Sequence, residues 1–84
     1  MEIDRMSLKV GAKVVGVPHR PGTREYLTCE KGQITLWAGG EKLLLIAGDV
    51  AAFQGDQRHS YSNDGDEEAV GFSVVTFAPG NWSV

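Results

Sequence analysis

Turn-forming residues divide this chain into short segments, and their spacing limits what it can fold into. Glycine alone accounts for 11 of the 84 residues. Gly, Pro, Asn and Asp recur between runs rich in β-branched and aromatic side chains, and the apolar residues keep no sustained period of 3.6. Such spacing is typical of an all-β sandwich or barrel. We expect strands at about residues 6–10, 12–17, 25–29, 33–37, 42–46, 50–53, 59–62 and 69–77.

Three of the connecting segments have the composition of tight turns. Residues 30–32 (Glu-Lys-Gly) separate two β-prone runs and predict a hairpin with Gly32 in the left-handed conformation. Residues 38–41 contain two glycines and predict a second turn. Residues 63–66 (Asn-Asp-Gly-Asp) predict a third.

Length and composition predict one packed domain over residues 1–84. Apolar residues make up 42% of the chain, which is enough for a core and too many for a disordered segment. No apolar run approaches the length of a membrane span, and the N-terminus has no signal-peptide character. Cys29 is the single cysteine, so no internal disulfide forms, and we expect a reducing, cytoplasmic setting.

The charge argues against nucleic acid as a direct partner of this chain. The net charge is −3. Residues 1–42 carry seven Lys or Arg against five acids, whereas residues 43–84 carry only Arg58 against six. The sequence therefore has no basic stripe and no basic helix. We expect no direct nucleic-acid contact and no membrane contact.

Strand alternation predicts which side chains share an interior. If Glu25 points inward, Leu27 and Cys29 do so too; if His59 points inward, so do Tyr61 and Asn63. The resulting interior mixes imidazole, carboxylate and phenol groups with apolar side chains. Mostly apolar walls with a few convergent polar groups are typical of a small-molecule pocket.

Two stretches then resemble the paired motifs of the cupins, a family of small antiparallel jelly-roll barrels (double-stranded β-helices). In the first motif, His19 matches the first histidine, Glu25 the glutamate and Gly32 the closing glycine. In the second, the matching residues are Gly48, His59 and Asn63. The resemblance runs from about residue 6 to residue 77 and implies the cupin fold. It implies no single activity, because this fold carries many functions.

The chain also departs from the cupin pattern. Pro21 stands where the first motif has its second histidine, and Gln54 and Asp56 replace a proline and a glycine of the second. The remaining ligand set is His19, Glu25 and His59, which suits a single divalent metal such as Fe, Mn, Zn or Ni with open positions. The resemblance thus implies either no cofactor or one weakly held metal.

The same three residues are the expected ligand-binding site, with Tyr61 and Phe53 as lining residues. An alternative keeps His19 and His59 as satisfied polar residues at a barrel mouth. A second alternative has Glu25 bonded only to backbone N–H groups or to Arg20 or Arg24. These alternatives stay open at the level of sequence.

The segment from His19 to Leu27 is similar to the barrel that follows a helix-turn-helix in many bacterial transcription regulators. That similarity implies a domain that senses a small molecule and pairs into homodimers. This chain shows no helix-turn-helix, so it would be the sensor portion of such a protein or a stand-alone relative. We favour this regulatory role over two alternatives: a mononuclear metal-dependent enzyme (dioxygenase or isomerase) and a structural dimer module without a ligand.

The expected homodimer uses the N-terminal strand and the faces that bear large aromatic side chains. A barrel of this size leaves sheet edges and apolar side chains uncovered. Aromatic residues are enriched at interfaces, and those proposed for the contact are Trp37, Phe77 and Trp82. The alternative is that all three belong to the core.

Overall fold

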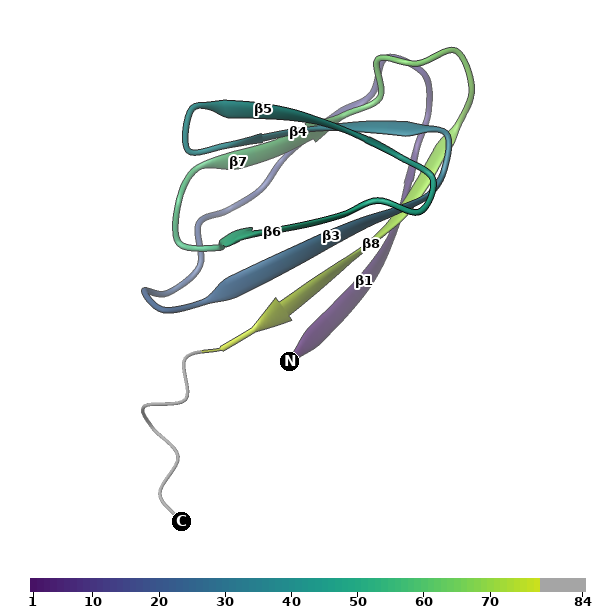
Figure 1. Cartoon of the computed structure of the whole chain (residues 1–84). Helices are drawn as coiled ribbons and strands as arrows, with labels where there is room; N and C mark the ends of the chain where they lie inside the picture. The colour runs from purple at the N-terminus through teal and green to yellow at the C-terminus, as the bar shows by residue number, and fades with distance from the viewer. Residues whose placement is uncertain (78–84) are drawn as a thin grey trace.

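The computed structural model describes residues 1–77 and forms two sheets that face each other (Figure 1). Each sheet has four strands, and every pairing between strands is antiparallel. No helix occurs in residues 1–77, and so none long and apolar enough to cross a membrane. The strands are β1 (Glu2–Leu8), β2 (Lys13–Val15), β3 (Arg24–Lys31), β4 (Gln33–Ala38), β5 (Glu41–Ile46), β6 (Val50–Gln54), β7 (His59–Ser62) and β8 (Ala69–Thr76).

Successive strands lie in alternate sheets, except for β4 and β5, which belong to the same sheet. One sheet has the order β1-β8-β3-β6 and the other the order β2-β7-β4-β5. Only β4 and β5 are consecutive strands that pair directly; most neighbours come from distant parts of the sequence. This winding is the jelly roll, or double-stranded β-helix, and it confirms the predicted all-β barrel.

Alternation along each strand places the core between the sheets. On β3, Glu25, Leu27 and Cys29 are buried while Arg24 is exposed. On β4, Ile34 and Leu36 are fully buried. Burying an aliphatic side chain of this size contributes about 1.5–3 kcal/mol. The inward set predicted from the sequence is therefore confirmed on both strands that carry the pocket, since His59, Tyr61 and Asn63 are buried as well.

The connection at residues 30–32 is not a hairpin, and that prediction was wrong. β3 and β4 belong to different sheets, so the chain crosses from one sheet to the other at Gly32, whose φ is +71°. A register shift between Cys29 and Lys31 bends β3 just before the crossing. Residues 38–41 do form a hairpin, because Ala38 pairs with Glu41 around two glycines of positive φ.

The first strand is also displaced from its predicted position. β1 begins at Glu2 and ends at Leu8, so Val10 lies outside it and is 57% exposed. The partner strand explains both limits. β1 pairs residue for residue with β8, from Glu2 opposite Val75 to Leu8 opposite Ala69, where β8 begins.

Asn63 ties the end of β7 to two other segments. Its amide nitrogen donates to the Leu8 carbonyl at 2.9 Å and to the Glu67 carbonyl at 2.8 Å. Its amide oxygen accepts from the Gly65 N–H at 3.0 Å. The side chain is fully buried, so these bonds fix the loop that leads into β8.

Candidate ligand and metal site

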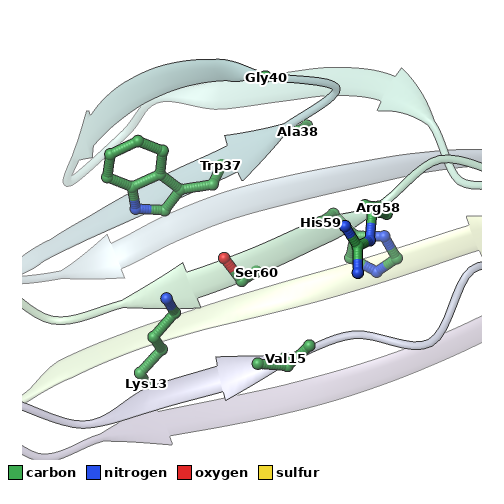
Figure 2. Close-up of a pocket in the computed structure, with 8 residues that line it drawn as sticks. All are labelled: Lys13, Val15, Trp37, Ala38, Gly40, Arg58, His59 and Ser60. Atoms are coloured by element: carbon green, nitrogen blue, oxygen red, sulfur yellow. The ribbon is translucent and has the colours of Figure 1, made fainter.

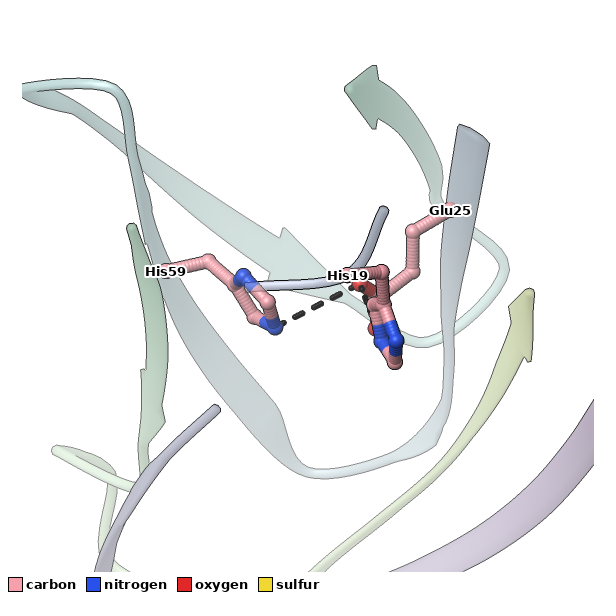
Figure 3. A group of neighbouring side chains, drawn as sticks. All are labelled: His19, Glu25 and His59. Carbon is pink, nitrogen blue, oxygen red and sulfur yellow. Dashed lines mark ion pairs between the residues drawn. The ribbon is translucent and has the colours of Figure 1, made fainter. Parts of the chain in front are cut away.

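Two side chains of one sequence motif and a third from more than thirty residues further on meet between the sheets (Figure 3). His19 comes from the loop before β3, Glu25 from β3 and His59 from β7. The Nε2 atom of His59 lies 3.4 Å from Glu25 Oε2, and Nε2 of His19 lies 3.9 Å from the same oxygen. One ligand atom from each residue lies within 4.8 Å of the other two. The structure thus brings together the three residues singled out from the sequence.

The two oxygens of Glu25 have different surroundings. Oε1 accepts hydrogen bonds from the Tyr61 hydroxyl and from Ser73 Oγ, the latter at 2.8 Å. Oε2 is buried and has no hydrogen-bond donor among the described residues. Burial raises the pKa of Tyr61 well above its usual range, and the hydrogen bond to Glu25 raises it further. Tyr61 therefore stays a donor that aims the carboxylate, and leaves Oε2 free to face the histidines.

A hydrogen bond to a backbone carbonyl orients the ring of His59, and a glycine leaves the space that the ring occupies. Nδ1 lies 2.9 Å from the Gln57 carbonyl oxygen, so Nδ1–H donates, and in the neutral ring the lone pair is on Nε2, the atom that faces Glu25. Gly16 leaves room for this ring. A Cβ added at Gly16 would lie 2.1 Å from His59 Nε2.

His19 sits at the mouth of the site, where its side chain is 30% exposed. Its loop is fastened to the end of β6: the His19 N–H donates to the Gly55 carbonyl at 2.9 Å, and the Gly55 N–H donates to the Thr23 carbonyl at 2.8 Å. A Cβ at Gly55 would crowd Thr23 at 3.2 Å and His19 at 3.4 Å. The two imidazole rings are stacked 6.1 Å apart at 20°.

These contacts leave a lone-pair nitrogen of His59 and an unpartnered carboxylate oxygen facing each other. Two acceptors at 3.4 Å repel unless a proton or a cation lies between them. Ligand atoms held at about 2.0–2.2 Å from one metal lie roughly 3–4.4 Å apart, and both separations from Oε2 fall within that range. The three ligand atoms together lie within 4.8 Å of one another, so a small movement of the partly exposed His19 would complete the site. Two histidines and one carboxylate therefore fit a divalent cation of the first transition series or zinc.

The site opens into a pocket of about 260 Å³. Tyr61 lines it, as the sequence analysis expected. Phe53 does not; it packs beside His59 with ring centroids 5.6 Å apart. The remaining lining residues are Glu2, Asp4, Met6, Gly16, Val17, Ser73 and Val75.

Sequence reasoning missed most of these lining residues. Ser73 could have been predicted, since strand alternation along β8 places Ser73 and Val75 on one face. Glu2 and Asp4 could not be predicted as lining residues, because the first strand was expected to begin at Met6. Gly16 gives no signal in the sequence, since its role is to make space for a ring 43 residues further on.

The pocket lining is acidic. Glu2, Asp4 and Glu25 contribute three carboxylates, and neither Lys nor Arg is part of it. Glu2 and Asp4 are exposed and extend the negative charge to the opening.

Comparison with known proteins places the chain in a family. The sequence profile described as "Cupin domain" matches residues 4–80. No curated protein matches.

Solved structures are similar over most of the chain. The Cupin_2 domain of an XRE family transcriptional regulator from Enterobacter cloacae has a TM-score of 0.82 at 26% identity, covering 89% of this chain and 81% of that one. An HTH_3 family transcriptional regulator from Vibrio cholerae has the same TM-score at 25% identity, covering 89% of this chain and 42% of the regulator. A sugar phosphate isomerase of the cupin superfamily from Silicibacter pomeroyi has a TM-score of 0.74 at 28% identity, covering 92% and 50%.

This chain thus spans most of the first structure and half or less of the other two. Similarity to a de novo designed double-stranded β-helix, at 19% identity and a TM-score of 0.77, concerns the fold alone. The two half-motifs, the winding of the strands and the profile match agree: the chain belongs to the cupin family.

Proposed function

We propose that this cupin domain binds a small amine-bearing molecule through a divalent cation held by His19, Glu25 and His59, and that it is the sensor domain of a bacterial transcription regulator. The observation that carries the proposal is the buried Oε2 of Glu25, which has no donor and faces two imidazoles at the bottom of an open pocket.

The donor set supports the cation. Glu25 supplies a charge and His59 a lone pair held in place by the Gln57 carbonyl. Pro21 supplies no fourth ligand, so we expect weak binding, with water or the ligand completing the coordination. A bound cation would act as a Lewis acid toward a ligand lone pair. Tyr61 and Ser73 would keep the carboxylate oriented.

The charge of the lining supports the ligand class. One divalent cation with Glu25 leaves a net charge of about +1, and Glu2 and Asp4 change that to about −1. An anionic ligand would have to approach two carboxylates with no Lys or Arg in the lining. A protonated amino group pairs with these carboxylates, whereas a neutral amino group has the lone pair that a cation would accept.

The regulatory role is supported by the two regulator structures that match at 25% and 26% identity. A sensor also needs only reversible binding, which a weakly coordinated cation and an open pocket provide.

Metal binding is tested by calorimetric titration of EDTA-treated protein with Zn²⁺, Ni²⁺ and Mn²⁺ separately. Glu25→Gln should weaken binding by about tenfold or more, since it removes the one ligand charge. The matched control is Glu30→Gln, an exposed residue on the same strand that should change nothing. Equal binding by both variants would remove the proposed site.

The ligand class is tested with a matched pair of four-carbon probes, 1,4-diaminobutane and succinate, on metal-saturated protein. The diamine should bind more tightly, and the Glu2→Gln/Asp4→Asn double variant should abolish or reverse the preference. Glu67→Gln/Glu68→Gln, in an exposed loop, serves as the control. Tighter binding of succinate by the unmodified chain would contradict the amine class while leaving the metal site intact.

A metal-dependent enzyme is the second candidate, favoured by the open positions that three protein ligands leave on a cation. Incubation of metal-loaded protein with a bound amine separates the two roles. A sensor returns the compound unchanged in its NMR spectrum, whereas an enzyme converts it.

A further inference from the structure

A second hollow lies on the outer face of the sheet β2-β7-β4-β5, and Figure 2 shows the residues that line it. Its volume is about 350 Å³, and His59 is the one lining residue that it shares with the pocket described above. Its floor is the small side chain of Ser60 on β7, which is paired with Val15 on β2 and Trp37 on β4. A small residue between two large ones leaves a groove along β7, with the larger side chains as its walls.

The groove is positively charged. Lys13 and Arg58 line it, and no carboxylate does. Within residues 1–77, the side-chain pairs at ion-pair distance join only Glu25 to its two histidines, so Lys13 and Arg58 are unpaired. The chain as a whole carries a net charge of −3, and Arg58 is the one cation of residues 43–84. Two unpaired cations in one groove of an acidic protein attract anions locally.

An aromatic wall adds a surface for a planar group. Trp37 is 40% exposed. The Lys42 ammonium lies 5.1 Å from the centre of the indole, a cation–π contact that restrains the ring and adds a third positive charge beside the groove. Val15, which is 73% exposed, forms the opposite apolar wall.

We infer that this groove is a second binding site, for a small planar anion: an aromatic or heteroaromatic ring that carries a carboxylate or a phosphate. The ring stacks on Trp37 and packs toward Val15. The anionic group accepts hydrogen bonds from Arg58, whose guanidinium suits both anions, and from Lys13. Ser60 offers a hydroxyl between them. His59 lines this groove as well as the pocket of the cation site, while Lys13, Trp37 and Arg58 line the groove alone. The proposal rests on those three residues and needs no bound metal.

The test is calorimetric titration of EDTA-treated protein with AMP and with 4-hydroxybenzoate, each beside its uncharged counterpart, adenosine or phenol. At least one anion should bind with a dissociation constant of about 100 µM, and the uncharged compounds about tenfold more weakly. Binding of AMP alone assigns a phosphate ligand, and binding of 4-hydroxybenzoate alone a carboxylate.

Variants locate the binding. Arg58→Gln and Trp37→Leu should each weaken binding by about tenfold. Arg24→Gln, an exposed arginine on the other sheet, should leave it unchanged. The inference is overturned if neither anion binds at about 5 mM, beyond the range of weak specific binding, if adenosine binds as tightly as AMP, or if Arg58→Gln has no more effect than Arg24→Gln. Circular dichroism of each variant checks that the sheets are intact.

Discussion

Residues that are not candidate ligands position the three side chains that are. Gly16 has no side chain to offer, yet the imidazole of His59 occupies the space that a Cβ there would take. Ser73 is no candidate ligand, but its hydroxyl donates to Glu25 Oε1 and leaves Oε2 for the histidines. The positions of the candidate ligand atoms therefore depend on the small size of Gly16 and on the hydrogen bond from Ser73.

Gly16→Ala tests whether the empty space at Gly16 holds the ring of His59 in place. The new Cβ would lie 2.1 Å from His59 Nε2, so the ring must swing out of its place. Gly16 has no positive φ, so alanine fits its backbone. We expect metal affinity to fall about tenfold or more, since ligand orientation is worth that much. The free energy of unfolding of the metal-free protein should fall by about 1–3 kcal/mol, because the new Cβ crowds a buried ring. Unchanged affinity would show that the ring has another usable position.

The thiol of Cys29 should react very slowly with alkylating reagents in the folded protein. Burial raises the pKa of its thiol above the ordinary range, and the carboxylate of Asp49 raises it further. The folded state therefore holds the proton more tightly than the unfolded chain, so this group's contribution to stability is complete below the ordinary thiol pKa. It is lost as pH rises above that value toward the raised one.

The measurement is alkylation by iodoacetamide at pH 8. We expect the native protein to react at least about a hundredfold more slowly than the urea-unfolded chain, since only the thiolate attacks and the thiol is buried. Equal rates in both states would mean that residues around Cys29 open readily.

At the level of elements, whether a connection closes a hairpin or crosses between the sheets depends on which strands its two flanking strands pair with. Residues 30–32 and 38–41 both contain glycine with positive φ. The second closes a hairpin because β4 and β5 pair with each other, while the first crosses between sheets because β3 pairs with β6 and β8. The long connection from β7 to β8 is held instead by one side chain, Asn63.

Asn63→Ala should destabilise this connection strongly. It removes three hydrogen bonds and leaves buried backbone groups without partners, at a cost of roughly 2–4 kcal/mol in the free energy of unfolding. Urea denaturation measures the loss. Asp66→Ala, at an exposed position of the same loop, should change stability by no more than about 0.5 kcal/mol. A comparable loss in both variants would assign the effect to the loop rather than to Asn63.

For the whole molecule, the open edges of the two sheets favour self-association. β1 lies at the edge of its sheet and pairs on one side only in the described part of the chain, and Ile3 on it is 63% exposed. Trp37 and Phe77 are 40% and 45% exposed, so neither is a core residue, while Trp82 lies outside the described residues. An uncovered edge strand is a template for pairing with a second copy.

We predict a homodimer that uses the β1 edge. Light scattering at tens of micromolar should give about twice the mass of the chain, and Ile3→Lys should shift it toward the monomer by placing a charge in the contact. Val50→Lys is the matched control, because Val50 is equally exposed, at 63%, on the opposite edge strand β6. A monomer at these concentrations, or an equal effect of both variants, would contradict this interface.

Local patterns in the sequence determined the kind of elements and the direction of many side chains. Turn residues indicated where most of the strands lie, with β1 as the exception. Period-two alternation along the strands predicted that Glu25, His59 and Tyr61 point inward. Spacing within the two motifs then indicated that His19 belongs with them. These features depend on neighbours a few residues apart, so the sequence carries them directly.

Only the tertiary structure decided which strands pair and what else enters the pocket. β1 begins at Glu2 because β8 lies beside it, and this pairing brings Glu2 and Asp4 to the pocket and sets its charge. Gly16 makes room for His59 only because β2 pairs with β7. Such contacts join residues tens of positions apart, and no local preference encodes them, since each arises from packing two sheets against each other.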